Sequence, residues 1–267
     1  MNLVLLAWPL AIAFTVALVR RERWPRLAIE SFPTPARRAL ALSLLTLVLA
    51  IACFAPPLSL ESGAPGEPLG EVRFGSLFLG HGLLAGFLLL WWVLAERPDP
   101  RRFLSLRSLR RDELGRELQL GAAAGAAAWA VTMTVMALAA TAAGIAASED
   151  LAAGAAGDVP EVVRWIVGLP LAQRFLLVVS AGVVEEAFFR AFLQARSGIL
   201  VSSLLFASSH ANYGLPLMLV GVFTVSVVLG WLFRVRGNIV PCMVAHAVFD
   251  GVQLFLILPA VVGSGGG

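Results

Sequence analysis

Eight apolar runs divide this chain, and most of them are long enough to cross a lipid bilayer as a helix. A spanning helix needs about 20 mostly apolar residues. This spacing predicts an all-α, polytopic membrane protein with about eight transmembrane helices and no soluble catalytic domain. The runs lie at residues 3–19, 39–58, 76–95, 118–146, 172–194, 199–213, 215–233 and 239–260.

The composition supports the same class of protein. Hydrophobic residues make up 59% of the chain, charged residues make up 14%, and the mean hydropathy is +0.86. A soluble domain is nearer about 45–50% apolar and about 25% charged. The net charge of +3 does not indicate a nucleic-acid partner, because the basic residues are arginines that cluster between apolar runs. Cys53 and Cys242 lie inside apolar runs, where we expect small buried side chains rather than a disulfide.

The number of arginines alternates from one loop to the next. Loops 20–38 and 96–117 hold six and seven arginines, whereas loops 59–75 and 147–171 hold one each. Cytoplasmic loops are the arginine-rich ones in membrane proteins. With eight helices the arginine-rich links all fall on one side, which predicts an integral membrane protein with both termini outside the cytoplasm.

Other segments carry weaker signals. The first run has no basic residue before it, which predicts a retained helix rather than a signal peptide. The fourth run has small-xxx-small spacing, typical either of close helix packing or of an ordinary weak hydrophobic helix. Residues 158–171 are expected to lie at the membrane interface. Tryptophans near predicted helix ends are expected in aromatic belts, namely Trp91, Trp92, Trp165 and Trp231.

Two adjacent acids, Glu185 and Glu186, lie inside the fifth apolar run. A carboxylate at the centre of a membrane helix costs about 2.5–3.5 kcal/mol, so such a residue indicates a functional site. Glu186 and Arg190 are four residues apart and share a helix face, which predicts a buried structural ion pair. Glu185 is turned about 100° away from Glu186 and is left as the available carboxylate.

Two of the three histidines lie in the same half of the chain. His246 and Asp250 are four residues apart, as are Phe206 and His210, so each pair shares a helix face. His81 opens the third run and is interpreted as an interhelical hydrogen-bond donor.

A carboxylate and two imidazoles could activate a water molecule directly, with Glu185 as the base and a histidine orienting the water or stabilising an oxyanion. Alternatively, Glu185, His210 and His246 could hold Zn²⁺, the only cofactor that the residues suggest. The residues alone leave both routes open.

Three ordered motifs carry a family resemblance. Glu185-Glu-Ala-Phe-Phe-Arg190 resembles a Glu-Glu-x-x-x-Arg signature, Phe206-Ala-Ser-Ser-His210 resembles Phe-x-x-x-His, and His246-Ala-Val-Phe-Asp250 resembles His-x-x-x-Asn/Asp. Together they are similar to the CPBP intramembrane proteases, named for CAAX proteases and bacteriocin-processing proteins and also called the Abi family. This group includes CAAX prenyl protease 2 and myxosortase-like members.

The resemblance covers residues 172–260, which we expect to form the catalytic membrane domain within the C-terminal four helices. Residues 1–150 are N-terminal transmembrane helices without such a motif, and residues 261–267 are expected to be a flexible tail. The resemblance implies an intramembrane endopeptidase in the bacterial inner membrane. Glu185 would be the base, His210 its partner, and His246 with Asp250 would support the oxyanion or the water.

Asp250 departs from the asparagine of the eukaryotic CAAX protease. A neutral amide can donate a hydrogen bond to an oxyanion, but an ionised carboxylate cannot. Asp250 would therefore be protonated, orient His246 or bind a metal. Family members have been described both as metalloproteases and as metal-free glutamate-dependent enzymes, so the resemblance also leaves the cofactor open.

Two other classes of function use similar residues. Intramembrane Glu, His and Asp also mark the ion pathway of a proton- or metal-coupled transporter, although no inverted repeat is visible. A non-catalytic membrane scaffold or immunity protein is the third class. For the protease, the expected partners are the lipid bilayer and a peptide or protein substrate, such as a lipidated protein, a leader peptide or a C-terminal sorting tag.

Overall fold

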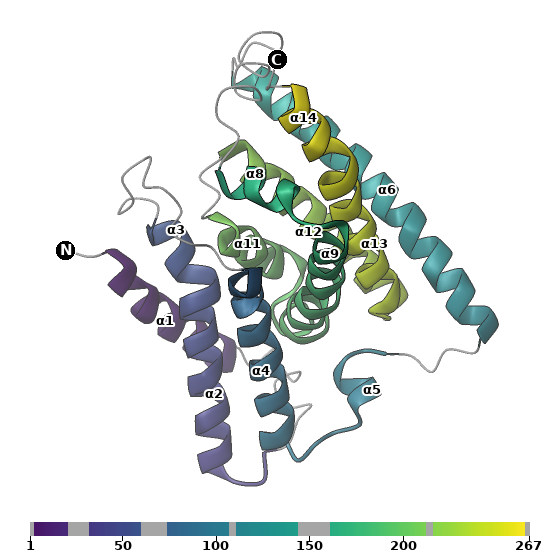
Figure 1. Cartoon of the computed structure of the whole chain (residues 1–267). Helices are drawn as coiled ribbons and strands as arrows, with labels where there is room; N and C mark the ends of the chain where they lie inside the picture. The colour runs from purple at the N-terminus through teal and green to yellow at the C-terminus, as the bar shows by residue number, and fades with distance from the viewer. Residues whose placement is uncertain are drawn as a thin grey trace.

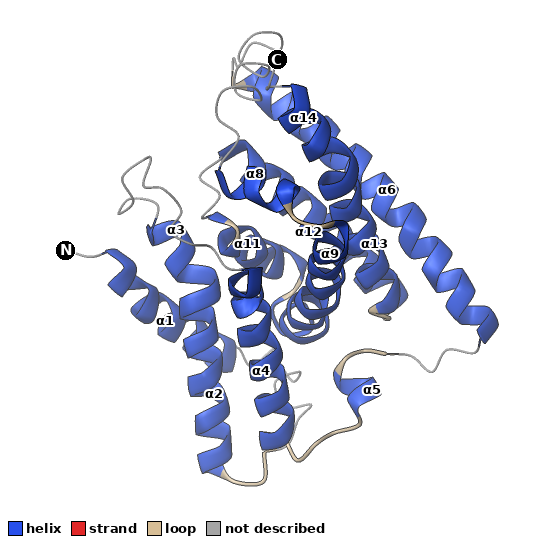
Figure 2. Ribbon diagram, viewed as in Figure 1, coloured by secondary structure: helices blue, strands red, loops and turns tan. Residues whose placement is uncertain are grey.

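The computed structural model describes residues 3–20, 32–59, 74–106, 111–143, 161–211 and 216–264, and in these ranges the elements are helices with no strand (Figures 1 and 2). The all-α prediction is confirmed. η1 and η4 are 3-10 helices and η3, η5 and η7 are π-helices. In chain order the elements are η1 (Leu3–Leu6), α1 (Ala7–Arg20), α2 (Pro35–Leu49), η3 (Ala50–Phe54), α3 (Ala55–Ser59), η4 (Phe74–Phe78), α4 (Leu79–Leu94), α5 (Pro100–Phe103), α6 (Arg111–Ala142), α8 (Glu161–Gly168), α9 (Leu171–Glu186), η5 (Ala187–Gln194), α10 (Ala195–Ser197), α11 (Ile199–Ser209), α12 (Pro216–Arg236), α13 (Val240–Val252), η7 (Gln253–Ile257) and α14 (Leu258–Ser264).

Each of the eight predicted runs holds a helix among the described residues. Four described helices are long and apolar enough to cross a membrane, namely Pro35–Leu58, Glu113–Ala142, Leu217–Arg236 and Val240–Val262. Three shorter apolar helices accompany them, namely Val4–Arg20, Leu79–Leu94 and Ile199–Ser209. The fifth run forms the continuous helix α9–η5–α10, which carries the two glutamates. The chain is therefore an integral membrane protein.

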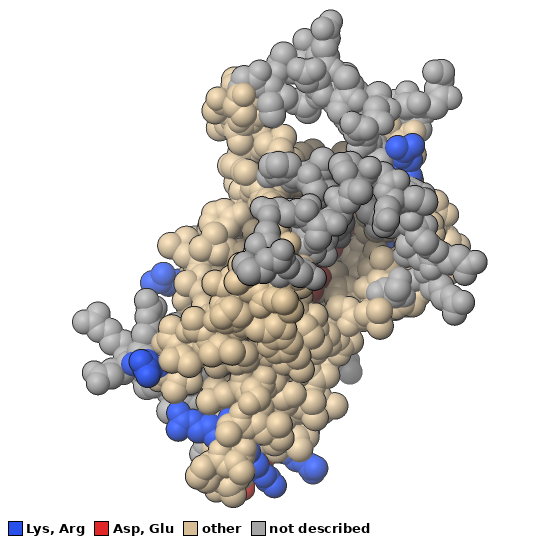
Figure 3. Space-filling view, turned by 90° about the vertical axis from the view of Figure 1, so that its left-hand side faces the viewer, with Lys and Arg blue, Asp and Glu red and all other residues tan. Residues whose placement is uncertain are grey.

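The surface of the described residues agrees with a lipid environment. Many large apolar side chains are exposed, among them Leu5, Leu10, Ile12, Leu40 and Ile51. On the face that holds α1 and α2, uncharged residues cover the middle, and arginines gather mainly towards the lower end (Figure 3). Such a large exposed apolar surface is unusual for a soluble monomer and is expected where lipid covers it.

The central helix is packed on all sides in its π-helical part. All eight residues of η5 are buried, because α4, α11 and α12 surround it. Phe188 and Phe192 meet Phe87 edge-on, with ring centroids 5.6 and 5.0 Å apart. The Trp91 ring packs edge-on against Phe192 and is 0% exposed. The prediction that Trp91 lies in an aromatic belt is therefore wrong. Trp91 belongs to the core, whereas Trp231 is 61% exposed.

Two glycines of α6 allow α13 to approach closely, and the two helices run side by side in Figure 1. A Cβ added at Gly121 would lie 2.8 Å from the Pro241 carbonyl oxygen, and one at Gly125 would lie 2.6 Å from the Ala245 carbonyl oxygen. Such distances are inside van der Waals contact, so only glycine fits. Of the two alternatives for the fourth run, the structure shows the close helix packing. This packing positions α13, which carries His246 and Asp250.

The remaining predictions concern smaller features. Cys53 and Cys242 are both free and buried, which confirms that they do not form a disulfide. Within the predicted interfacial segment, α8 begins directly after Pro160 and packs against α14. α14 continues to Ser264, so the helix extends into the predicted tail, and residues 265–267 lie outside the described residues.

Candidate active site

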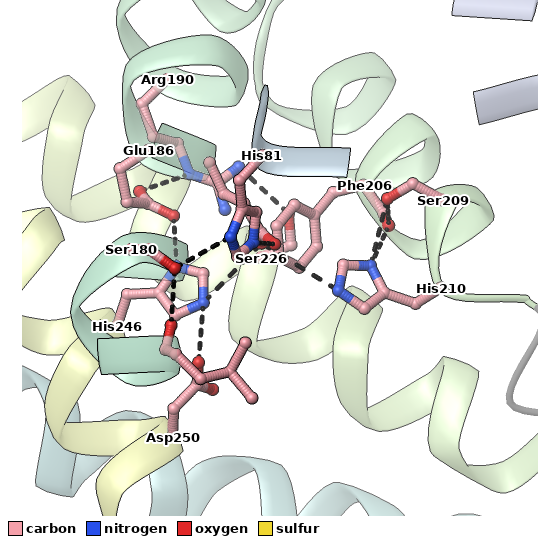
Figure 4. A network of polar contacts seen from close by, with 12 residues as sticks. His81, Ser180, Glu186, Arg190, Phe206, Ser209, His210, Ser226, His246 and Asp250 are labelled. Atoms are coloured by element: carbon pink, nitrogen blue, oxygen red, sulfur yellow. Dashed lines mark hydrogen bonds and ion pairs between the residues drawn. The ribbon is translucent and has the colours of Figure 1, made fainter. Parts of the chain in front are cut away.

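Three helices bring the four predicted site residues to one cavity of about 940 Å³. Glu185 lies near the end of α9, His210 directly follows α11, and His246 and Asp250 lie on α13. All four line the cavity, whose wall is otherwise mainly apolar. Figure 4 shows the polar side chains of this site converging from these helices.

The two carboxylate oxygens of Glu185 have different surroundings. Oε1 lies 3.1 Å from His81 Nε2. Oε2 lies 4.0 Å from His210 Nε2 and 3.9 Å from His246 Nε2, and it is buried with no hydrogen-bond partner among the described residues. The side chain is 13% exposed and lines the cavity. One oxygen is therefore held in place, and the other faces two imidazoles.

The end of α11 orients His210. The backbone N–H of His210 donates to the Ala207 carbonyl, which leaves the Phe206 carbonyl without its usual i+4 amide. His210 Nδ1 lies 2.8 Å from the Phe206 carbonyl oxygen. A carbonyl only accepts, so Nδ1 carries a proton and donates there. The other nitrogen, Nε2, is directed towards Glu185, and the Phe206 ring packs against the imidazole at 4.6 Å.

Glu186 supports the site from the fully buried side. Its Oε2 accepts a hydrogen bond from Arg190 Nε at 3.0 Å, and both side chains are 0% exposed. Arg190 also donates to Ser226 Oγ at 3.0 Å. The ion pair expected from the spacing is present. Glu186 has a second partner that the sequence did not indicate, because its Oε1 lies 2.9 Å from His246 Nδ1. Glu186 thus links the ion pair to one of the site imidazoles.

Asp250 lies beside the nitrogen of His246 that faces the cavity. The distance from Asp250 Oδ2 to His246 Nε2 is 3.4 Å, and the Asp250 side chain is 27% exposed. His246 is therefore bracketed by two carboxyl groups, Glu186 at Nδ1 and Asp250 at Nε2. Among the three roles left open for Asp250, this contact favours orientation of His246.

His81 joins this site from the N-terminal half of the chain. Its Nε2 contacts Glu185, and its Nδ1 lies 2.9 Å from Ser180 Oγ. The contact is interhelical, as we expected, but its partner is the candidate catalytic carboxylate. The sequence did carry a signal for this role of His81. His81 is an ionisable residue within an apolar run, and such a residue indicates a functional site, as for the two glutamates.

The predicted Zn²⁺ ligands do not lie at ligand spacing in this arrangement. Ligand atoms about 2.0–2.1 Å from a tetrahedral zinc ion are about 3.4 Å apart. Glu185 Oε2 is 4.0 Å from His210 Nε2 and 3.9 Å from His246 Nε2. No group of three His, Cys, Asp or Glu side chains in the described ranges is placed to hold a metal ion.

Comparisons with known proteins point to one family. A family model described as type II CAAX prenyl endopeptidase Rce1-like matches residues 167–252, the segment that contains all three motifs. The uncharacterised protein YpbD of Bacillus subtilis (strain 168) is 36% identical over 69 residues. That alignment covers 26% of this chain and 36% of YpbD, about a third of its length. No solved structure matches. Residues 167–252 are therefore an Rce1-like domain, which belongs to the CPBP protease family as the motifs predicted.

Proposed function

We propose that this protein is an intramembrane endopeptidase that hydrolyses peptide bonds with a water molecule activated by Glu185 and histidines. One observation carries the proposal. Glu185 Oε2 is a buried carboxylate oxygen without a hydrogen-bond partner among the described residues, and it faces two imidazole Nε2 atoms at 3.9 and 4.0 Å. Polar atoms at this separation are commonly bridged by water. A water about 2.8 Å from each is within ordinary hydrogen-bond distance.

The side chains have complementary roles toward this water. His210 carries its proton on Nδ1, so its Nε2 accepts a hydrogen bond. The water then donates one hydrogen to His210 Nε2 and the other to Glu185 Oε2, and its lone pair is free to attack. Glu185 takes the proton as the oxygen bonds to the carbonyl carbon, and passes it to the leaving nitrogen as the C–N bond breaks.

His246 acts on the carbonyl oxygen of the substrate. Glu186 fixes its Nδ1, and Asp250 lies beside its Nε2. Because Nδ1–H is donated to Glu186, His246 acts as an imidazolium between the two carboxyl groups, and its Nε2–H donates to the oxygen as negative charge develops on it. Protein atoms and the apolar cavity surround this contact, which strengthens it relative to the same contact in water.

The cavity supports a substrate that comes from the membrane. Its volume of about 940 Å³ and its mostly apolar wall suit an unwound apolar segment or a lipid-modified one. Lipidated proteins, leader peptides and C-terminal sorting tags are the candidate classes. We also propose the bacterial inner membrane, with both termini outside the cytoplasm. The arginines that gather mainly towards the lower end of the face shown in Figure 3 support that orientation.

The test uses the purified full-length chain in proteoliposomes with three internally quenched peptides. One is a farnesylated C-terminal peptide, one is a membrane-anchored leader peptide, and one is a C-terminal tag after a transmembrane helix. We expect cleavage of at least one of them, and Glu185→Gln should lower kcat by at least about 100-fold, as expected for a general base. The unfolding temperature of Glu185→Gln should match that of the parent, because glutamine can still accept from His81.

Further outcomes separate the alternatives. Cleavage that survives in Glu185→Gln would refute the proposal, and Glu185-dependent ion flux without cleavage would indicate a transporter. If neither cleavage nor flux depends on Glu185, the chain is a non-catalytic scaffold. Activity that persists after chelation, in protein shown by elemental analysis to be metal-free, would support the side-chain mechanism. If only Zn²⁺ restores activity, a metal-dependent mechanism replaces the side-chain mechanism.

A further inference from the structure

We infer that His81 is a positioning residue of this site, which holds one oxygen of Glu185 so that the other is left for the water. The inference rests on the proposed function and extends it to α4. His81 lies outside residues 167–252, so the family match does not include it. The N-terminal half of the chain would then supply part of the active site.

Both nitrogens of His81 contact the same neighbouring helix. Nε2 lies 3.1 Å from Glu185 Oε1, and Nδ1 lies 2.9 Å from Ser180 Oγ. Ser180 and Glu185 both belong to α9. Phe78 lies edge-on to the imidazole at 6.0 Å. A ring fixed at both nitrogens and flanked by an aromatic side chain has little freedom to turn, so its hydrogen bond to Glu185 is well defined. Figure 4 shows His81 and Ser180 side by side within the network.

The Ser180 hydroxyl allows His81 to donate to Glu185 in either protonation state of the carboxyl group. Ser180 Oγ lies 3.1 Å from the Leu177 carbonyl oxygen as well as 2.9 Å from His81 Nδ1. When the hydroxyl donates to Nδ1, His81 carries its proton on Nε2 and donates it to Glu185 Oε1. After Oε2 takes the proton from the water, Oε1 is the carbonyl oxygen of a neutral carboxyl group and still accepts from Nε2–H. The carboxyl group is thus held before and after it takes the proton.

The two oxygens of Glu185 therefore have different roles. His81 occupies Oε1, and Oε2 is the oxygen that faces His210 and His246. Without His81 the carboxyl group would be free to rotate within the cavity. The water would then lose its fixed acceptor, and effective catalysis depends on such fixed geometry.

The test compares three substitutions under the conditions described above, with the peptide that the parent cleaves. His81→Leu should lower kcat by about 10- to 100-fold, the factor that corresponds to a hydrogen bond to a charged group. KM should stay within about threefold, because both nitrogens of His81 are engaged by Glu185 and Ser180 and leucine keeps the cavity wall apolar. His81→Gln should recover kcat to within about threefold of the parent, because its amide can donate to and accept from Glu185. Ser180→Ala should lower kcat less than His81→Leu does.

Gly82→Ala is the matched control on α4, since an added Cβ there meets nothing within 4 Å and Gly82 does not line the cavity. Unfolding temperatures are measured for every variant. The inference is overturned if His81→Leu keeps the parent kcat, or if His81→Gln loses as much as His81→Leu. If Glu185→Gln remains active the proposed function fails instead, so the two failures are distinguishable.

A second measurement does not depend on substrate. Cysteines placed at residues 81 and 185, with Cys53 and Cys242 replaced by alanine, should be joined by a short bifunctional thiol reagent. Leu89→Cys paired with Glu185→Cys is the control, because Leu89 lies farther along α4 with an exposed side chain. Equal cross-linking of the two pairs, or none for the first pair, would contradict the contact between His81 and Glu185.

Discussion

Glu186→Gln should destabilise the protein although it changes only one atom of a side chain. Glu186 accepts two hydrogen bonds with two oxygens, from Arg190 Nε at 3.0 Å and from His246 Nδ1 at 2.9 Å. Glutamine offers one acceptor oxygen, and its NH₂ group would face a donor. Arg190 is 0% exposed and would keep its positive charge, with only Ser226 as a partner among the contacts described above.

Breaking a buried ion pair from one side costs about 3–5 kcal/mol. That is a large fraction of the about 5–15 kcal/mol by which a folded domain is typically stable. The assay is equilibrium unfolding in mixed micelles, followed by circular dichroism. Glu185→Gln is the matched control, because it changes the adjacent carboxylate and should leave stability nearly unchanged.

Removing the charges of both Glu186 and Arg190 tests whether the unpaired charge of Arg190 causes the loss of stability. The double variant Glu186→Gln/Arg190→Met has no unpaired buried charge, so it should be more stable than Glu186→Gln alone. A loss below about 1 kcal/mol for Glu186→Gln would refute the reasoning, since buried pairs cost several times more. If Glu186→Gln is stable but inactive while Glu185→Gln is active, the two roles are reversed.

Two further predictions concern α13 and its neighbour. Asp250→Asn should keep kcat within about 2- to 10-fold of the parent, because its carbonyl oxygen can still contact His246 and a neutral hydrogen bond corresponds to that factor. Asp250→Leu should lower kcat further. Equal losses of kcat for the two variants in peptide-cleavage assays would exclude orientation of His246 as the role of Asp250. Gly125→Ala should destabilise by about 1–3 kcal/mol, a typical cost of overpacking, because the added Cβ lies 2.6 Å from the Ala245 carbonyl oxygen. Gly86→Ala, which meets nothing within 4 Å, should not destabilise, and unfolding measurements compare the two directly.

Contacts within one helix were predictable from the sequence, because helical phase alone determines them. Glu186 with Arg190 and His246 with Asp250 are each four residues apart, and both pairs are in contact in the structure. The same phase separated Glu185 from Glu186: Glu186 pairs with Arg190 and Glu185 contacts His81, although both carboxyl groups approach His246. The apolar runs were predictable for a similar reason, since lipid requires about 20 apolar residues wherever a helix crosses it.

Contacts between helices were not predictable in the same way. His81 and Glu185 are 104 residues apart, and Glu186 and His246 are 60 apart. Such pairs depend on which helices become neighbours and at what rotation, and the spacing of residues within a single sequence does not encode either. The buried position of Trp91 was missed for the same reason. Its place near a helix end suggested the membrane surface, but Phe87 and Phe192 surround it.

The π-helical segment η5 restricts insertions and deletions in the helix that carries the two glutamates. Its residues Ala187–Gln194 follow directly after the two glutamates, and all of them are buried. π-helical turns accommodate more residues than α-helical ones, and they are frequent at functional sites. Loss of one residue would let this segment relax towards an α-helix, and each residue of an α-helix turns the chain by about 100°. Glu185 would then rotate away from the cavity while every apolar side chain kept its character. A conservative substitution of an apolar residue of η5 should therefore be tolerated better than a change in the number of its residues.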